Sequence, residues 1–183
     1  PIQHILDRCT ITAQTSTTVS YNATSSYTPN DNYGFFFQDH PGTLDQLGEW
    51  YYNKSTKKLR MYWGATAPGP IEISAVDALI NVTSRNYITI NNLDLKGANM
   101  MGLYLASGSN IKVNYCDLSY MGQDGIDATN ALNVEVTNCT VNWALNNGMK
   151  FGQSANNVTS NHIIKNCTIT NIQMLAGMGL SGD

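Results

Sequence analysis

The second half of the chain carries a repeated pattern in which apolar residues alternate with polar ones. One set of apolar residues recurs at intervals of 23, 23 and 28 residues, and its members are Ile90, Val113, Val136 and Ile164. A second set keeps the same intervals and contains Leu95, Leu118, Val141 and Ile169. Strict alternation over a few residues is typical of a strand with one buried face. The pattern therefore predicts short strands that recur once in every repeat.

Sharp corners separate these predicted strands. One equivalent corner position is occupied in successive repeats by Asn92, Tyr115, Asn138 and Asn166. Asparagine tolerates the left-handed backbone of a tight corner, and stacked side-chain amides can bond from one repeat to the next. A further strand begins each time at a glycine, at Gly102, Gly125, Gly148 and Gly179. Three short strands per repeat, at a period of 20 to 50 residues, predict an all-β parallel β-helix, a solenoid of stacked coils.

The pattern divides the chain into three parts. Residues 1–12 are predicted to end an earlier coil, because His4–Thr12 matches His162–Thr170. Residues 13–70 are predicted to be an inserted module of strands and an aromatic-rich hairpin, and residues 71–183 to be β-helix coils that begin with strands at 71–74 and 78–82. A solenoid end requires a polar cap, and neither end of the chain resembles one. We therefore expect a fragment of a longer protein.

The inserted module has two predicted pairs of strands. Residues 13–32 alternate weakly and are predicted to form exposed strands. The motif Gly48-Glu-Trp-Tyr-Tyr-Asn53 and the segment Lys58–Trp63 are predicted to pair through a turn at 53–57, with aromatic side chains opposite one another. The aromatic residues either form a platform for a sugar ring or, as we favour, cover the flank or mouth of the solenoid.

Composition narrows the range of partners. Charged residues make up 13% of the 183 residues, and the formal net charge is −3. The chain therefore offers no basic surface for nucleic acid or anionic lipid. No apolar run approaches the length of a membrane span.

The four cysteines are predicted to share one position in the coils. These residues are Cys9, Cys116, Cys139 and Cys167. Stacked strands hold Cβ atoms about 4.8 Å apart and parallel, whereas a disulfide needs about 3.8 Å and inclined bonds. We expect buried free thiols rather than disulfides or a zinc site.

With these motifs, the chain resembles the right-handed parallel β-helix repeat proteins of bacterial secretion. It is most similar to the large secreted or surface-exposed proteins of Bacteroidetes, many of which end in a type IX secretion sorting domain. The resemblance implies a right-handed coil, an extracellular or outer-surface location and contact with secretion machinery. It implies no single activity, because this fold hosts polysaccharide lyases, glycoside hydrolases, adhesins and passive stalks.

One face of the predicted solenoid carries candidate catalytic groups. Tyr104, Asp127 and Lys150 should lie side by side on successive coils, followed by Ser181. A tyrosine, a carboxylate and a lysine could bind a uronate or abstract a proton next to its carboxyl group. The resemblance to polysaccharide lyases of this fold implies a site on this face. The alternative is that Asp127 and Lys150 are an ordinary exposed ion pair.

The loops that lead into this face carry candidate carbohydrate-binding residues. These are Gln123, Asp124, Trp143 and Asn147. Several lyases of this fold hold calcium through carboxylates, and Asp124 with Asp127 forms the only close acidic pair. Calcium binds six to eight oxygen ligands, so two carboxylates make only a weak candidate site. No other metal is expected.

Two histidines begin equivalent strands, His4 and His162. Alternation turns both side chains inward, so we expect half-buried, hydrogen-bonded rings rather than catalytic bases.

We hypothesise that the chain is a non-catalytic, rigid segment of a large secreted or cell-surface bacterial protein that serves adhesion or contact with a glycan. The alternatives are a polysaccharide lyase or glycoside hydrolase with its groove on the Tyr104/Asp127/Lys150 face, and a passive spacer.

Overall fold

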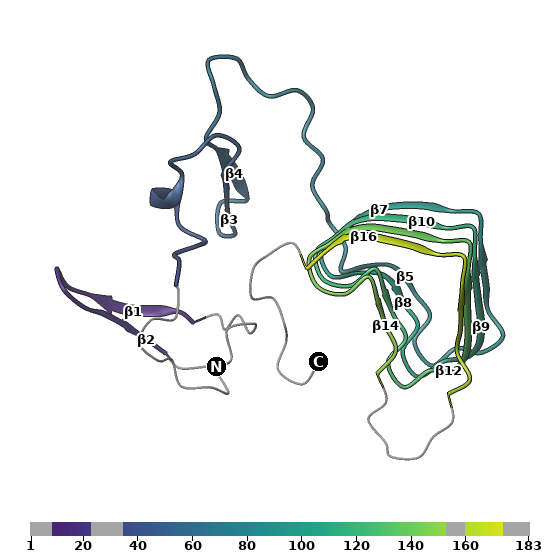
Figure 1. Ribbon diagram of the computed structural model, residues 1–183. Helices are drawn as coiled ribbons and strands as arrows, with labels where there is room; N and C mark the ends of the chain where they lie inside the picture. Colours follow the sequence, from purple (N-terminus) through teal and green to yellow (C-terminus); the bar gives the residue numbers. More distant parts are fainter. Residues whose placement is uncertain (1–8, 23–34, 153–159, 174–183) are drawn as a thin grey trace. The chain divides into compact units, whose positions relative to one another are not determined.

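The computed structural model of the chain describes residues 9–22, 35–152 and 160–173 (Figure 1). The chain divides into two structural units. One unit contains Tyr27–Glu72, and the other contains Pro1–Ser26 together with Ile73–Asp183.

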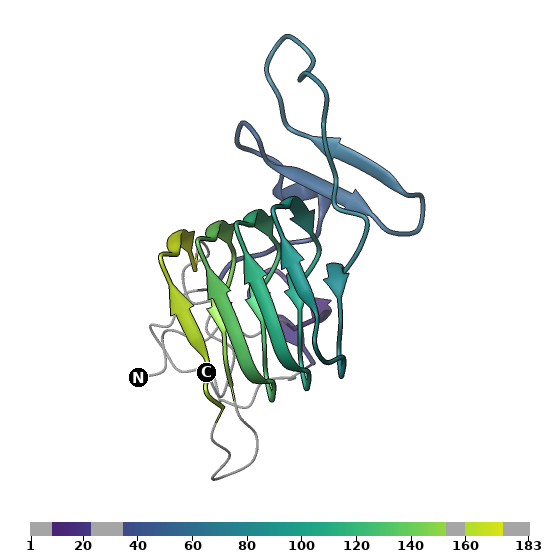
Figure 2. The same cartoon turned by 90° about the vertical axis from the view of Figure 1, so that its right-hand side faces the viewer.

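The repeats form a solenoid of three parallel sheets, each of which takes one strand from every coil (Figures 1 and 2). The first sheet contains β5 (Ala78–Asn81), β8 (Met101–Tyr104), β11 (Ile126–Asp127) and β14 (Met149–Lys150). The second sheet contains β6 (Thr89–Asn91), β9 (Ser109–Asn114), β12 (Leu132–Thr137) and β15 (Ile163–Lys165). The third sheet contains β7 (Asp94–Ala98), β10 (Asp117–Met121), β13 (Thr140–Ala144) and β16 (Thr168–Ile172).

The strand register confirms the predicted columns of apolar side chains. In the second sheet, Ile90 pairs with Val113, Val113 with Val136, and Val136 with Ile164. In the third sheet, the column contains Leu95, Leu118, Val141 and Ile169. The interior of the solenoid is therefore a stack of similar layers.

The core is most completely buried in the middle coils. Val113 and Val136 are fully buried, whereas Ile164 and Ile169 in the last described coil are 51% and 40% exposed. In the part of the chain that the structure describes, no strand pairs with β15 or β16 on their outer edge. A coil buries its apolar face only where another coil stacks on it.

The corners adopt the left-handed backbone that was predicted for Asn92, Tyr115, Asn138 and Asn166, with φ between 50° and 57°. The amide of Asn166 donates to that of Asn138 at 3.2 Å, so one link of the predicted asparagine ladder forms. Three further columns have positive φ: Ser84, Ser107 and Asn130; Tyr87, Asn110, Asn133 and Asn161; and Gly97, Tyr120, Trp143 and Asn171. Each coil thus turns at regularly repeated positions.

The predicted thiol column also forms within the solenoid. Cys116, Cys139 and Cys167 are free thiols, of which the first two are buried. The Sγ of Cys139 donates to the Val113 carbonyl oxygen of the preceding coil at 3.7 Å. Cys9 is exposed.

A separate hairpin lies near the N-terminus. It pairs β1 (Ile11–Gln14) with β2 (Val19–Tyr21) in antiparallel fashion, and both strands are exposed. Exposed strands were predicted for residues 13–32, although the first one begins two residues earlier. Most of the predicted earlier coil, residues 1–12, lies outside the described residues, while Ile11 and Thr12 belong to this antiparallel hairpin rather than to a parallel strand.

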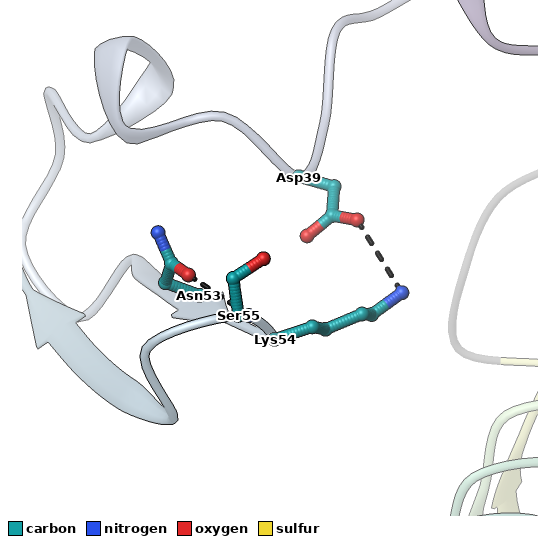
Figure 3. Close-up of polar contacts among 4 residues, drawn as sticks. All are labelled: Asp39, Asn53, Lys54 and Ser55. Carbon is teal, nitrogen blue, oxygen red and sulfur yellow. Dashed lines mark hydrogen bonds and ion pairs between the residues drawn. The ribbon is translucent and has the colours of Figure 1, made fainter.

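The second unit contains the predicted aromatic hairpin, in which β3 (Trp50–Asn53) pairs with β4 (Lys58–Met61). It also contains a short 3-10 helix, η1 (Pro41–Thr43), that His40 caps by accepting a hydrogen bond from the Gly42 nitrogen. At the hairpin turn, Asn53 accepts from the Ser55 nitrogen at 3.0 Å and Lys54 pairs with Asp39 at 3.6 Å (Figure 3). Both ion-pair partners are exposed, so their contribution is about 0–1 kcal/mol.

Two details of the prediction for this region are wrong. The aromatic residues of β3 do not face aromatic residues, since Trp50 pairs with Met61 and Tyr52 with Leu59. Residues 71–74 form no strand, and the first coil strand is β5. Residues 71–74 have the alternating pattern of a strand, but they pair with no described strand. Ile71 and Ile73 consequently remain 48% and 64% exposed.

Candidate functional site

The first sheet places the candidate catalytic residues side by side, in the predicted register. Asp127 pairs with Tyr104 on one side and with Lys150 on the other, and Asn81 extends the column. Ser181 lies outside the described residues. The structure therefore brings a phenol, a carboxyl group and an ammonium group onto three successive coils.

The central carboxyl group of this column is largely withdrawn from solvent. Asp127 is 8% exposed, and its Oδ1 accepts a hydrogen bond from the Thr129 nitrogen at 2.8 Å. Tyr104 and Lys150 are partly exposed. Asp127 thus holds the turn after β11, a structural role that limits its access to a substrate.

Asp124, a candidate carbohydrate-binding residue, is fully buried. Its Oδ1 accepts three hydrogen bonds from the next coil: from Asn146 Nδ2 at 3.0 Å, from the Asn147 nitrogen at 3.0 Å and from Asn147 Nδ2 at 3.1 Å. The carboxyl group therefore links two coils. A sugar would reach it only if those coils separated.

Burial raises the pKa of Asp124 above its ordinary value of 3.8. The hydrogen bonds from Asn147 and the charge of Lys150 oppose this shift, and the charge of Asp127 adds to it. Asp124 Oδ2 and Asn146 Oδ1 are both buried and have no hydrogen-bond partner among the described residues. A proton on Asp124 would relieve the cost of burying its charge.

Asp124 and Asp127 were also the weak calcium candidates. Each has one oxygen engaged by protein N–H groups. Within residues 9–22, 35–152 and 160–173, no group of three or more His, Cys, Asp or Glu side chains could hold a metal ion.

The other candidate sugar ligands lie in different surroundings. Gln123 and Asn147 are partly exposed, and Asn147 already donates two hydrogen bonds to Asp124.

Trp143 lies at a corner of the third sheet and is 39% exposed. Its ring stacks on that of Tyr120, with 6.2 Å between centroids and 8° between planes. The Nζ of Lys96 lies 5.7 Å from the Tyr120 centroid. Three successive coils thus contribute a lysine, a tyrosine and a tryptophan.

Polar side chains accompany this aromatic pair on the third sheet. Asn142 Oδ1 accepts from Thr170 Oγ1 at 3.1 Å and from Asn171 Nδ2 at 2.8 Å. Sequence reasoning missed Tyr120, Asn142 and Asn171. The signal was present, since Tyr120 and Trp143 are one 23-residue repeat apart, each two residues after a core position of the third sheet.

The second sheet carries a shallow groove on its outer side. Its lining includes Tyr87, Asn110, Asn133 and Ile163, and an ion pair of 3.3 Å between Lys112 and Glu135 crosses it. This face is not the one that holds Tyr104, Asp127 and Lys150.

His162 is half-buried, as predicted. Its Nδ1 accepts from the Val134 nitrogen at 3.3 Å, and its ring lies 4.8 Å from that of Phe151. The predicted hydrogen bonding is met at Nδ1 only, because Nε2 is buried and has no hydrogen-bond partner among the described residues. Burial lowers the pKa of His162, which favours the neutral ring. His4, its predicted equivalent, lies outside the described residues.

Among the described residues, the structure contains no helix with the length and apolar character needed to cross a membrane.

Comparison with known proteins addresses the fold. A family model described as "Right handed beta helix region" matches residues 76–181, which is more than half of the chain. No curated protein matches, and no solved structure does. The match begins two residues before β5 and covers all three parallel sheets. With its columns of stacked side chains and its strands in parallel register, the chain belongs to the right-handed β-helix family.

Proposed function

We propose that this chain is a non-catalytic, rigid β-helix segment of a large secreted or cell-surface bacterial protein, and that its outer surface makes contact with carbohydrate. The observation that carries the proposal is the contrast between two sets of side chains. The aromatic pair Tyr120 and Trp143 is exposed, whereas the carboxyl groups of Asp124 and Asp127 are buried and hold the backbone.

The hydrogen-bond pattern supports a rigid scaffold. Backbone groups of every coil bond to the next coil at the corners as well as in the strands, for example Tyr115 N to Thr137 O at 3.1 Å and Asn138 N to Lys165 O at 3.0 Å. A coil cannot bend without breaking several of these bonds together. Such a stack is suited to presenting a surface at a fixed geometry.

The exposed aromatic residues support contact with a glycan. Aromatic rings have an apolar face that packs against the C–H groups of a sugar ring, and neighbouring polar groups fix its orientation. Asn142, Thr170 and Asn171 supply such groups beside Trp143.

The second candidate function is that of a polysaccharide lyase or glycoside hydrolase. The register that aligns Tyr104, Asp127 and Lys150 favours it. Against it, Asp127 is 8% exposed and its Oδ1 accepts a hydrogen bond from the Thr129 nitrogen, so this carboxyl group holds a turn instead of facing a substrate.

The experiment that separates the two functions uses purified protein and soluble polysaccharides. Affinity gel electrophoresis with neutral and acidic polysaccharides should show retarded migration, while uronate polymers should give no absorbance from unsaturated products. Cleavage that is lost in both Lys150→Ala and Asp127→Ala would overturn the non-catalytic proposal in favour of the enzyme. If none of the polysaccharides retards the protein, the proposed contact with carbohydrate is refuted.

Export to the cell surface by the type IX route, as in Bacteroidetes, is part of the same proposal and rests on the sequence resemblance. The full reading frame tests it. A leader at one end and a sorting domain at the other are expected, and a reading frame with neither would contradict this route.

A further inference from the structure

We propose that Trp143, Asn142 and Asn171 form a binding site for a ring of a neutral polysaccharide on the outer face of the third sheet. This inference rests on the proposed contact with carbohydrate, and it adds the location of that contact and the class of carbohydrate that binds there.

The aromatic pair is held in a defined orientation. The nearly parallel ring of Tyr120 supports Trp143 on one side, and Tyr120 in turn lies beneath the ammonium group of Lys96. Trp143 nevertheless remains 39% exposed. A supported, partly exposed indole loses little conformational entropy when a ligand stacks on it.

The backbone at these two residues is unusual for aromatic side chains. Tyr120 and Trp143 have φ of 61° and 60°, and their counterparts on the neighbouring coils are Gly97 and Asn171, which adopt this conformation readily. A large residue in this region costs of order 1 kcal/mol, and such residues cluster at functional sites. Tyr87 and Tyr115 share the conformation, but among the described residues neither stacks on another ring.

The polar groups next to Trp143 are also pre-arranged. Thr170 and Asn171 both donate to Asn142 Oδ1, which fixes the three side chains relative to one another. The Asn142 amide nitrogen and the Asn171 amide oxygen have no partner among the described residues. One donor and one acceptor are thus available beside the indole, and sugar hydroxyl groups can bond to both.

The charge distribution on the third sheet selects the ligand class. The strands β13 and β16 carry only uncharged groups on this face, which are Thr140, Asn142, Thr168 and Thr170. On the same face, the strands β7 and β10 carry two carboxylates side by side, those of Asp94 and Asp117, and one cation, Lys96, which lies over the Tyr120 ring. Two carboxylates outnumber one ammonium group, so an acidic polysaccharide that extended from Trp143 across the sheet would bring its own carboxylates towards a face with an excess of negative charge, which is unfavourable. A neutral polysaccharide meets no such repulsion.

The test measures binding of the purified chain to neutral polysaccharides (β-glucan, xylan and mannan) and to polygalacturonate, by affinity gel electrophoresis and by tryptophan fluorescence. The variants are Trp143→Ala, Asn142→Ala and, as a matched control, Tyr115→Ala, which removes another exposed corner aromatic. Fluorescence is recorded in a Trp50→Phe/Trp63→Phe background, so that Trp143 is the sole reporter, and is used for the variants that keep Trp143; the Trp143 variants are compared by affinity gel electrophoresis. Circular dichroism verifies that each variant is folded, and Trp143→Phe should keep part of the affinity.

We expect at least one neutral polysaccharide to bind, with an affinity reduced at least about tenfold by Trp143→Ala, which corresponds to about 1.4 kcal/mol. Asn142→Ala should weaken binding and Tyr115→Ala should leave it unchanged. Binding that survives Trp143→Ala, or a preference for polygalacturonate, overturns this site but leaves carbohydrate contact intact. No binding to any polysaccharide overturns both.

Discussion

Single residues decide how closely the coils approach one another. A Cβ atom added to Gly102 would lie 2.7 Å from the Gly125 carbonyl oxygen, and one added to Gly125 would collide with the carbonyl oxygen of Gly148 and with Val141 Cγ1. No side chain fits between the backbones at this position. Gly102 in β8 and Gly125 immediately before β11 are therefore required by space.

Gly125→Ala is expected to destabilise the solenoid by about 1–3 kcal/mol, because overpacking forces the backbone of the next coil to shift. Denaturant unfolding would measure the change. Gly152→Ala is the matched control, since its added Cβ would meet its nearest described atoms, those of Thr129, at 3.8 and 3.9 Å. Equal effects of the two substitutions would contradict the steric explanation.

The buried carboxyl group of Asp124 predicts a dependence of stability on pH. Its pKa is raised in the folded state by burial, so the folded protein holds this proton at a pH where the unfolded chain has lost it. The group's contribution to stability is complete below the ordinary value of 3.8 and is lost as the pH rises through the folded-state pKa.

Asp124→Asn should remove this dependence, because the amide does not titrate and its oxygen can still accept the hydrogen bonds from Asn146 and Asn147. Denaturant unfolding over a series of pH values should show wild type losing stability relative to the variant as pH rises above 3.8. Asp117→Asn, at an exposed carboxylate of the third sheet, controls for the change in net charge. A wild type that gained stability relative to Asp124→Asn over this range would refute the prediction.

At the scale of elements, the columns that run from coil to coil are the units of structure. The thiols illustrate this: each Sγ bonds to a carbonyl oxygen of the preceding coil, at 3.9 Å for Cys116, 3.7 Å for Cys139 and 3.5 Å for Cys167. Burial raises the pKa of Cys139 to about 11. The column therefore behaves as a buried apolar ladder.

Alkylation with iodoacetamide at about pH 8 should consequently distinguish the thiols, because the thiolate is the reactive form. In the folded protein, Cys9 should react while Cys116 and Cys139 do not, and all four should react in denaturant. Mass spectrometry of the peptides gives the result. Rapid modification of Cys139 without unfolding would show that the column is open to solvent.

At the scale of the whole solenoid, stability should be a sum over coils and the interfaces between them. Each strand of the middle coils pairs only with the equivalent strands of the two adjacent coils. Removal of one complete repeat should therefore leave the remaining pairings possible.

Deletion of residues 116–138, one repeat of 23 residues, joins Tyr115 to Cys139 and keeps the corner sequence. We expect a folded protein with a β-sheet circular dichroism spectrum and a lower melting temperature, since one interface is lost. Deletion of residues 116–135 is the control, because it shifts the register by three residues. If the second deletion were the better tolerated, the additive description of the solenoid would fail.

Much of the architecture followed from the sequence, for a physical reason. Alternation of apolar and polar residues depends only on neighbours along the strand, and the repeat period aligns one strand with the next. These two features were enough to predict the columns of Val113 and Leu118, the left-handed corner at Asn138 and the free thiol of Cys139.

Only the tertiary structure decided which polar and aromatic side chains face solvent. Asp124 has the sequence of a surface turn, yet it is buried because Asn146 and Asn147 of the next coil surround its carboxyl group. The repeat period places Trp143 next to Tyr120, but only the folded chain shows that their rings stack at 6.2 Å and that Trp143 stays 39% exposed. Burial and side-chain pairing in a solenoid depend on the neighbouring coils, and local sequence does not contain that information.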